Sequence, residues 1–147
     1  MPLSARELLA RTIRCEAEGE GDNGQKAVAT VIMNRVHIPY GEYARVNQGD
    51  LRKVILQPFQ FTCSMTQING VPNPQNIYNM TPNAQHYAIA DWALSGNKLW
   101  DVPLSLWYYN PYSPQCEIYF PRNQTGVWHT RIAQHCFYNP TPKYSQT

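Results

Sequence analysis

Residues 7–36, "ELLARTIRCEAEGEGDNGQKAVATVIMNRV", hold two apolar stretches on either side of an acidic, glycine-rich turn. Ser4 and Glu7 form the Ser-x-x-Glu pattern of a capping box, which marks the start of a helix. The residues that then recur at helical spacing are Leu8, Leu9, Thr12, Ile13 and Glu16. We therefore predict a first helix that begins after Ser4 and ends at Gly19.

The second apolar stretch predicts a helix over residues 24–36, because "QKAVATVIMNRV" is apolar on nearly every side. A helix of this kind is buried in a protein core, so we expect Asn34 to be buried and hydrogen-bonded. Asp22 or Asn23 is available to cap the first turn of this helix.

The middle of the chain predicts two more helices separated by a loop. Asp50 is expected to cap the short helix "LRKVIL", and residues 64–80 are rich in Pro, Asn and Gly, which is typical of a long loop. Thr81 and Pro82 are expected to open the next helix, with Gly96 just past its end.

The C-terminal part predicts extended structure. Residues 104–111, "LSLWYYNP", alternate as a strand does, and a second extended piece within residues 127–140 could pair with them. The pattern as a whole is mostly helical with a small C-terminal β-hairpin or sheet, so the predicted fold class is α+β. A length of 147 residues suits a single domain over residues 1–147.

The amino-acid composition indicates which classes of ligand the chain can bind. Charged residues make up 15% of the chain and the formal net charge is +2, so a neutral polar ligand is favoured over a polyanion. Without a basic stripe, the chain lacks the electrostatic pattern of a nucleic-acid-binding protein. No apolar run approaches the ~20 residues that span a bilayer, and the N-terminal segment lacks the pattern of a signal peptide.

The chain has four cysteines, namely Cys15, Cys63, Cys116 and Cys136. Without an export signal, free thiols are the default expectation, and a Cys116–Cys136 bridge is the alternative. These two cysteines, with His129 and His135, lack the paired ligand spacing of zinc modules. We therefore expect neither a catalytic metal nor a cofactor.

Glu16 occupies an unusual place among the acidic residues of the turn. At about 100° per residue, Glu16 falls in the core-facing stripe of the first helix, whereas Glu18 is rotated about 200° away, toward solvent. Burial raises the pKa of a carboxyl group, and a protonated glutamate is the general acid that cleavage of a glycosidic bond requires. The structural alternative is that Arg35 or a backbone amide satisfies Glu16.

A second catalytic carboxylate is not singled out by spacing. The remaining candidates are Glu18, Glu20, Asp22, Glu42, Asp50, Asp91, Asp101 and Glu117. Glycine beside Glu20 leaves the direction of that side chain open.

The segment quoted above, with "QPFQF" at 57–61 and "HTRIAQHCFY" at 129–138, resembles the SleB/CwlJ-type cell-wall hydrolases of spore-formers. These cortex-lytic enzymes act on peptidoglycan during germination, and the resemblance runs from about Leu8 to Tyr138. The first glutamate of the family motif Glu-Ala-x-Gly-Glu is catalytic and corresponds to Glu16. Without a signal peptide or a wall-binding repeat, the chain is more similar to the CwlJ branch.

The resemblance implies a lysozyme-like or lytic-transglycosylase-like core in which one glutamate serves as acid and then as base. It also implies synthesis in the mother cell, a location at the periphery of the spore coat and cortex, and a possible spore-coat protein partner. The implied activity is cleavage of peptidoglycan glycan strands, by a lytic transglycosylase or by a glycosidase of the muramidase or glucosaminidase type. The alternative is a non-catalytic peptidoglycan-binding or spore-coat structural module on the same fold.

Four further residues are predicted to bind substrate because their segments match family motifs. They are Gln60 and Phe61 in "QPFQF" and Tyr108 and Asn110 in "WYYNP". Aromatic side chains offer flat faces that suit stacking against sugar rings, although most aromatic residues of a chain lie in its core.

Overall fold

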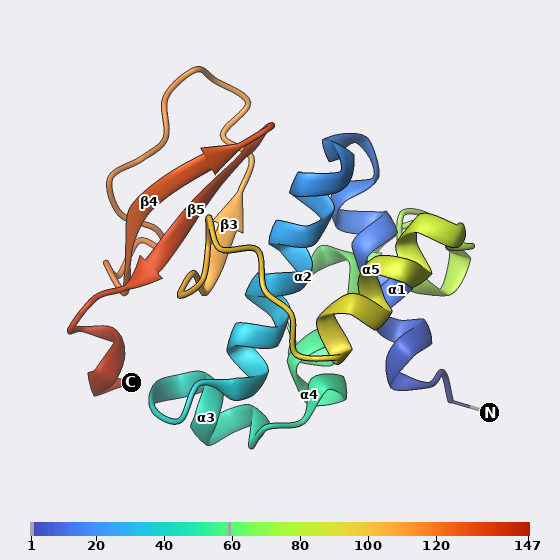
Figure 1. Ribbon diagram of the computed structural model, residues 1–147, viewed down its shortest axis with the longest axis horizontal. Coiled ribbons are helices and arrows are strands. Elements are labelled where there is room, and N and C mark those ends of the chain that lie inside the picture. Colours follow the sequence, from blue (N-terminus) through green and yellow to red (C-terminus); the bar gives the residue numbers. More distant parts are fainter. Residues whose placement is uncertain (1, 59) are drawn as a thin grey trace.

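The computed structural model describes residues 2–58 and 60–147, and Figure 1 shows a helical part beside a small sheet. The helical part contains α1 (Ala5–Ala17), α2 (Gly21–His37), α3 (Gly41–Asn47), α4 (Leu51–Leu56) and α5 (Ala84–Leu94). The sheet contains β3 (Trp107–Tyr109), β4 (Gly126–Ile132) and β5 (His135–Pro140). This arrangement confirms the α+β class, mostly helical with a small C-terminal sheet.

Helix α1 begins where the sequence predicts. The Ser4 side chain accepts a hydrogen bond from the Glu7 backbone N–H at 3.1 Å. The Glu7 carboxylate accepts from Arg11 at 2.9 Å instead of turning back to the cap, so the capping box is only half formed. The helix ends at Ala17 rather than at Gly19, because the 3₁₀ turn η1 (Glu18–Glu20) tightens the chain first.

Helix α2 begins three residues earlier than predicted, at Gly21. Gly21 has a φ of 76°, which a residue with a side chain rarely adopts, so the sharp turn between the two helices depends on glycine. Asp22 lies inside the first turn and pairs with Lys26 at 3.0 Å, so the prediction that it or Asn23 caps the helix is wrong. Near the other end of this helix, Asn34 is only 7% exposed, so its predicted burial is confirmed.

Two other predicted helix starts have different outcomes. Asp50 caps α4 by accepting from two backbone N–H groups, as predicted. Helix α5 begins at Ala84, because Asn83 and His86 form a capping box of their own, and Pro82 therefore precedes the helix. The predicted loop over 64–80 also contains ordered pieces: the hairpin of β1 (Gln67–Ile68) and β2 (Val71–Pro72), and the 3₁₀ turn η3 (Ile77–Asn79).

The sheet has the order β3-β5-β4, and all of its neighbouring strands are antiparallel. The single extended piece predicted within residues 127–140 is a hairpin, in which β5 forms the centre of the sheet. In the register of β3 and β5, Tyr108 lies opposite Phe137. The β3 strand is shorter than the predicted 104–111, because chain pairing is confined to its middle.

Three clusters of buried side chains hold the fold together. The largest lies between α1, α2, α4 and α5, and the second is an aromatic cluster around Trp107, Tyr138 and Tyr144. The third joins α2 to the sheet and consists of Ala27, Val31, Val102 and Phe137. Polar contacts add to this junction, because Asn34 donates to the Ser105 carbonyl at 2.9 Å.

Two disulfides link segments that are distant in the sequence, so the expectation of free thiols is wrong. Cys15 on α1 is bonded to Cys63 in the 3₁₀ turn η2 (Thr62–Ser64). Cys116 is bonded to Cys136 on β5, which is the alternative that the sequence left open.

In the described ranges, every helix is too short or too polar to cross a membrane.

Candidate active site

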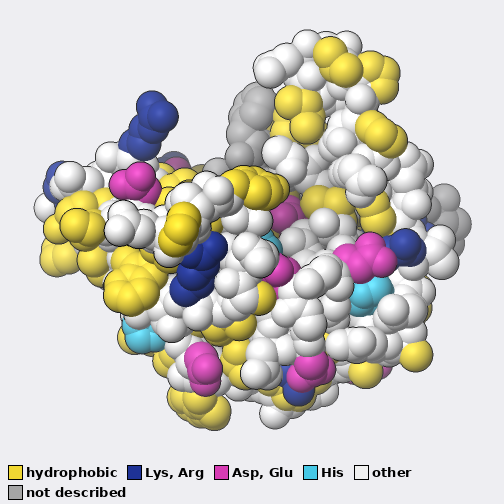
Figure 2. Space-filling view, turned by 90° about the horizontal axis from the view of Figure 1, so that it is seen from above, with side chains coloured by type: hydrophobic (Ala, Val, Ile, Leu, Met, Phe, Trp, Pro, Cys, Tyr) yellow, Lys and Arg dark blue, Asp and Glu magenta, His cyan; other side chains and the backbone are white. Residues whose placement is uncertain are grey.

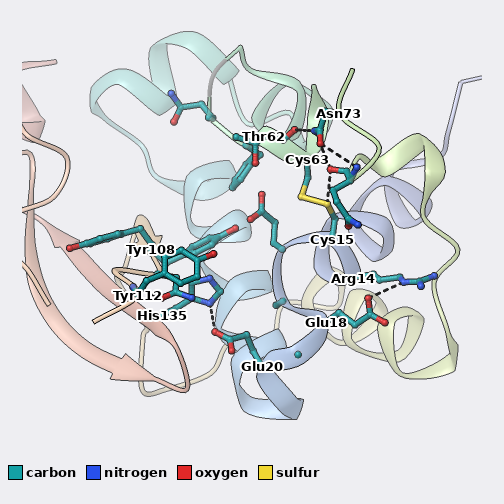
Figure 3. A pocket seen from close by; sticks show the side chains of 18 of the residues that line it. Arg14, Cys15, Glu18, Glu20, Thr62, Cys63, Asn73, Tyr108, Tyr112 and His135 are labelled. Atoms are coloured by element: carbon teal, nitrogen blue, oxygen red, sulfur yellow. Dashed lines mark hydrogen bonds and ion pairs between the residues drawn. A yellow bond between two sulfur atoms is a disulfide. The ribbon is translucent and has the colours of Figure 1, made fainter. Parts of the chain in front are cut away.

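A cleft of about 600 Å³ lies between the helical part and the sheet. Figure 2 shows this face hollowed between two raised parts of the surface. Figure 3 places Cys15, Cys63, Thr62 and Asn73 on one wall and Tyr108, Tyr112 and His135 on the other. All five residues that the sequence predicted for the site line this cleft: Glu16, Gln60, Phe61, Tyr108 and Asn110.

Glu16 lies in the last turn of α1 and faces into the cleft. Burial raises the pKa of its carboxyl group from 4.5 to about 7. The positive charge of Arg35 and the hydroxyl of Tyr108 favour the ionised form and limit this rise. Close to neutral pH, the protonated and ionised forms are therefore both populated.

Arg35 on α2 is only 4% exposed, and its guanidinium is held by groups other than Glu16. Its Nε donates to the Leu106 carbonyl at 2.7 Å, and its guanidinium carbon lies 4.7 Å from the ring centre of Tyr43 and 4.8 Å from that of Phe61. Within the described part of the chain, no ion pair joins Arg35 to Glu16. Arg35 therefore acts on Glu16 through its charge and leaves the carboxyl group free to face the cleft.

Tyr108 projects from β3 toward the end of α1. Its ring stacks on Phe61 with centroids 6.4 Å apart and meets His135 edge-on at 5.0 Å. The hydroxyl oxygen is buried and, among the described residues, has no hydrogen bond of ordinary geometry to the protein. It is close enough to lower the pKa of Glu16, so Tyr108 brings a free hydroxyl to the predicted acid.

The other predicted residues contribute in different ways to the cleft wall. Gln60 is fixed, because its Oε1 accepts from the Tyr43 hydroxyl at 2.9 Å. Phe61 is 3% exposed and packs against Tyr108, so it shapes the wall from inside the core. The Asn110 Oδ1 accepts from the Tyr112 backbone N–H at 2.8 Å, which orders the turn that follows β3.

Two more glutamates line the cleft. Glu18 is exposed and pairs with Arg14 at 3.4 Å, in agreement with its predicted solvent-facing direction. Glu20, whose direction the sequence left open, lies with its Oε1 2.7 Å from Nδ1 of His135. The remaining acidic candidates are not among the described lining residues: Asp22, Glu42, Asp50, Asp91, Asp101 and Glu117.

The sequence did not predict the wall of the cleft that carries the Cys15–Cys63 disulfide. Asn73 organises it, because its side-chain amide donates to the carbonyls of Thr62 at 3.1 Å and Met65 at 2.9 Å. The only sequence signal was the polar, proline-rich composition of 64–80, which does not indicate what the segment contacts.

The histidines and cysteines near the C-terminus do not form a cluster. Cys116 and Cys136 are bonded to each other, and His129 lies with its Nε2 2.9 Å from the Asp101 carbonyl. Over residues 2–58 and 60–147, no group of three or more His, Cys, Asp or Glu side chains is placed to hold a metal ion.

Glu16 thus lies at a helix end, in a cleft between helices and a small sheet. Two solved structures share the fold. The catalytic domain of the germination-specific lytic transglycosylase SleB from Bacillus anthracis has a TM-score of 0.64 and 24% identity, and the match covers 95% of this chain and 97% of that one. The catalytic domain of SleB from Bacillus cereus has a TM-score of 0.60 and 26% identity, covering 92% and 89%.

The chain belongs to the cell wall hydrolase family, whose model matches residues 19–138. It is 30% identical over 136 residues to the cell wall hydrolase CwlJ of Halalkalibacterium halodurans, a match that covers 92% of this chain and 85% of that protein. It is 29% identical to CwlJ of Bacillus subtilis, with coverage of 92% and 84%. These relatives confirm the resemblance drawn from the sequence motifs.

Proposed function

We propose that this chain is a single catalytic domain that cleaves the glycan strands of peptidoglycan in the spore cortex, with Glu16 as the general acid. The observation that carries the proposal is the position of Glu16 in the cleft, with a pKa raised by burial to about 7. Membership of the cell wall hydrolase family and the names of the relatives support the substrate. The family model begins at residue 19, so the assignment of Glu16 rests on geometry and motif.

In the proposed reaction, protonated Glu16 gives its proton to the glycosidic oxygen as the bond to the sugar breaks. The leaving sugar departs with a hydroxyl group, and the remaining sugar carries positive charge at its anomeric carbon. Glu16 is then ionised, and Arg35 and the Tyr108 hydroxyl favour this form. The same two groups that limit the pKa of Glu16 therefore stabilise the product of proton transfer.

The ionised Glu16 then acts as a base. It removes a proton either from the sugar's own 6-hydroxyl, which gives a 1,6-anhydro end, or from water, which gives a reducing end. A single carboxyl group is sufficient for the first route. We propose the lytic transglycosylase route, because the other acids that line the cleft, Glu18 and Glu20, are engaged by Arg14 and His135.

We also propose that the substrate-binding residues are Gln60, Phe61, Tyr108 and Asn110. Gln60 and Asn110 offer polar side chains at the cleft surface, and Tyr108 offers a hydroxyl close to the reacting bond. The wall of the cleft depends on Phe61 for its shape.

A further part of the proposal concerns location, and it rests on the resemblance of the sequence motifs to the CwlJ branch. We propose that the protein acts at the periphery of the spore coat and cortex, after synthesis in the mother cell, and that a spore-coat protein holds it there. Immunogold labelling of spore sections for this chain checks the location.

The Glu16→Gln variant tests the proposal, because it keeps the shape of the side chain and removes the acid. On purified cortex fragments, we expect a loss of muropeptide release of about 10²- to 10⁴-fold. The matched control is Glu18→Gln, two residues away, which removes an exposed carboxylate and should keep release within about threefold. Release by Glu16→Gln at the wild-type rate would overturn the proposal.

Mass spectrometry of the released fragments separates the two routes. An anhydro end and a reducing end differ by one water, and we expect anhydro ends. If only reducing ends are found, the chain is a hydrolase. If the wild-type chain binds cortex fragments without releasing any product, the alternative of a non-catalytic binding or coat-structural module replaces the enzyme.

A further inference from the structure

Glu20 and His135 meet across the cleft, and Figure 3 draws their contact. The Glu20 Oε1 lies 2.7 Å from the His135 Nδ1, and the two side chains are only 9% and 10% exposed. The same oxygen accepts a hydrogen bond from the Gln134 backbone N–H at 3.2 Å. Glu20 therefore contacts two consecutive residues, Gln134 in the β4–β5 turn and His135 at the start of β5, and Gln134 is 114 positions away in the chain.

This contact fastens one end of α2 to the sheet. Glu20 immediately precedes the first residue of α2, and His135 is the first residue of β5. The other end of α2 is fastened separately, because Asn34 donates to the Ser105 carbonyl at 2.9 Å and Arg35 donates to the Leu106 carbonyl at 2.7 Å. Loss of the Glu20–His135 contact therefore frees the sheet near the mouth of the cleft while the other end stays fixed.

The surroundings of the pair favour an uncharged His135 over an ion pair. Burial lowers the pKa of His135 to about 4 and raises the pKa of Glu20. The groups that face the pair are the Gln134 N–H and the Arg131 charge, both of which favour ionised Glu20, and the ring of Tyr108 against His135. His135 therefore stays uncharged near neutral pH, and the 2.7 Å approach of Nδ1 to Oε1 is a close contact between an uncharged ring and a carboxyl group.

His135 in turn supports the residue that faces the predicted acid. Its ring meets the Tyr108 ring edge-on with centroids 5.0 Å apart, and the Tyr108 hydroxyl is close to Glu16. Resting on the proposed function, we propose that Glu20 and His135 are positioning residues, which hold Tyr108 against Glu16 by linking the start of α2 to β5 across the cleft.

The Glu20→Ala and Glu20→Gln variants form the first test. Glu20→Ala removes the contact, and we expect kcat on soluble glycan strands to fall about ten- to a hundredfold while KM stays within about twofold, because a misplaced group slows chemistry more than binding. Glu20→Gln keeps an acceptor and a donor for Nδ1, so it should recover at least about a third of the wild-type kcat. Asp22→Ala is the matched control, since the exposed Asp22 carboxylate pairs with Lys26 and is not among the described residues that line the cleft, so its loss should not change kcat.

A double-mutant cycle with His135→Ala completes the test. Because the two residues act as one unit, Glu20→Ala and His135→Ala together should be no slower than the slower single variant. All variants are assayed well below their unfolding midpoints, measured by circular dichroism. An unchanged kcat in folded Glu20→Ala, a Glu20→Gln variant as slow as Glu20→Ala, or multiplying losses in the double variant each overturn the inference.

The Glu16→Gln variant distinguishes failure of the positioning role from failure of the proposed function. If Glu16→Gln is inactive and Glu20→Ala is fully active, the positioning role is wrong and the proposed function stands. If Glu16→Gln retains wild-type activity, the proposed function fails whatever the Glu20 variants do.

Discussion

The helical side of the cleft is packed with aliphatic side chains, whereas the sheet side is packed with aromatic ones. Leu9, Ile13 and Ile32 are completely buried on the first side, in regular helices whose spacing repeats along the sequence. Trp107 and Tyr138 are central to the second side, where strands of three to seven residues are joined by one long loop, between β3 and β4, and one tight turn, between β4 and β5. A covalent bond fixes each side, and the two sides meet at Glu16.

Because of this difference, the two sides of the cleft contribute to the site in different ways. The regular helix gives Glu16 a fixed direction and a partly buried position, because both follow from the phase of α1. The sheet side supplies Tyr108, whose place depends on strand pairing and on the contact of Glu20 with His135. Changes on the helical side should therefore alter the proposed acid itself, whereas changes on the sheet side should alter how well Tyr108 supports it.

Removing the disulfide of either side tests the comparison of the two sides and should have the largest effects on stability. Replacing Cys15 and Cys63 by Ser removes a link over 48 residues, and we expect a loss of about 4 kcal/mol in the free energy of unfolding. Replacing Cys116 and Cys136 removes a link over 20 residues, with an expected loss of about 3 kcal/mol. Urea unfolding of both double variants measures the difference, and a larger loss for the sheet-side pair would contradict this order.

Glu16→Gln should change how stability depends on pH. The pKa of Glu16 is about 7 in the folded chain against 4.5 ordinarily, so its neutral form contributes stability that is complete below pH 4.5 and lost as the pH rises through 7. The variant cannot ionise and avoids this loss. Its stability relative to wild type should therefore increase by about 3 kcal/mol between pH 4 and pH 8, as measured by urea unfolding.

Glu18→Gln is the matched comparison for this experiment. Glu18 is exposed, so the free energy of unfolding of Glu18→Gln relative to wild type should be nearly the same at pH 4 and pH 8. A Glu16→Gln variant with the same small pH response as Glu18→Gln would show that Glu16 is not held in its neutral form.

Tyr108→Phe tests the support from the sheet side. The hydroxyl favours ionised Glu16, so its removal should raise the pKa of Glu16 and move the fall of kcat with rising pH to higher pH. The variant also lacks the donor that could bond to ionised Glu16 as it forms, a contact of about 1.5 kcal/mol, so kcat should fall by about tenfold. The pH–rate profile measures both changes. An unshifted profile would contradict the role of the hydroxyl.

Asp91→Ala should have the smallest effect, because it breaks an ion pair on the outside of the helical part. Arg6 and Asp91 are in contact at 2.7 Å, yet both side chains are about half exposed. An exposed pair of this kind contributes little to stability, because solvent and salt screen the two charges. Thermal unfolding should shift by a few degrees at most, and kcat should not change.

The helical side could be predicted largely from the sequence, because its signals are local. The phase of α1 identifies Glu16 as core-facing, and the Asp50 cap follows from one residue and its neighbours. The start of α5 was misplaced because Asn83 competes with Pro82 as a start signal, and its partner His86 is an uncommon one for a capping box.

The sheet side could be predicted only in outline. Alternation predicted a strand around Tyr108, but nothing local shows that β4 and β5 form a hairpin or that His135 reaches Glu20. The Cys15–Cys63 bond was missed for the same reason, since it joins segments whose proximity arises only in the folded chain. Long-range contacts of this kind leave no periodic pattern in the sequence.

The break between α1 and α2 has an electrostatic consequence. Helix α1 ends one residue after Glu16, so that carboxyl group lies at the negative end of a helix dipole, which favours its protonated form. Helix α2 begins one residue after Glu20, so this second carboxyl group lies at a positive end, which favours ionisation. Two glutamates four positions apart therefore experience opposite helix-end fields, which add to the rise that burial gives the pKa of Glu16 and oppose the rise that burial gives the pKa of Glu20.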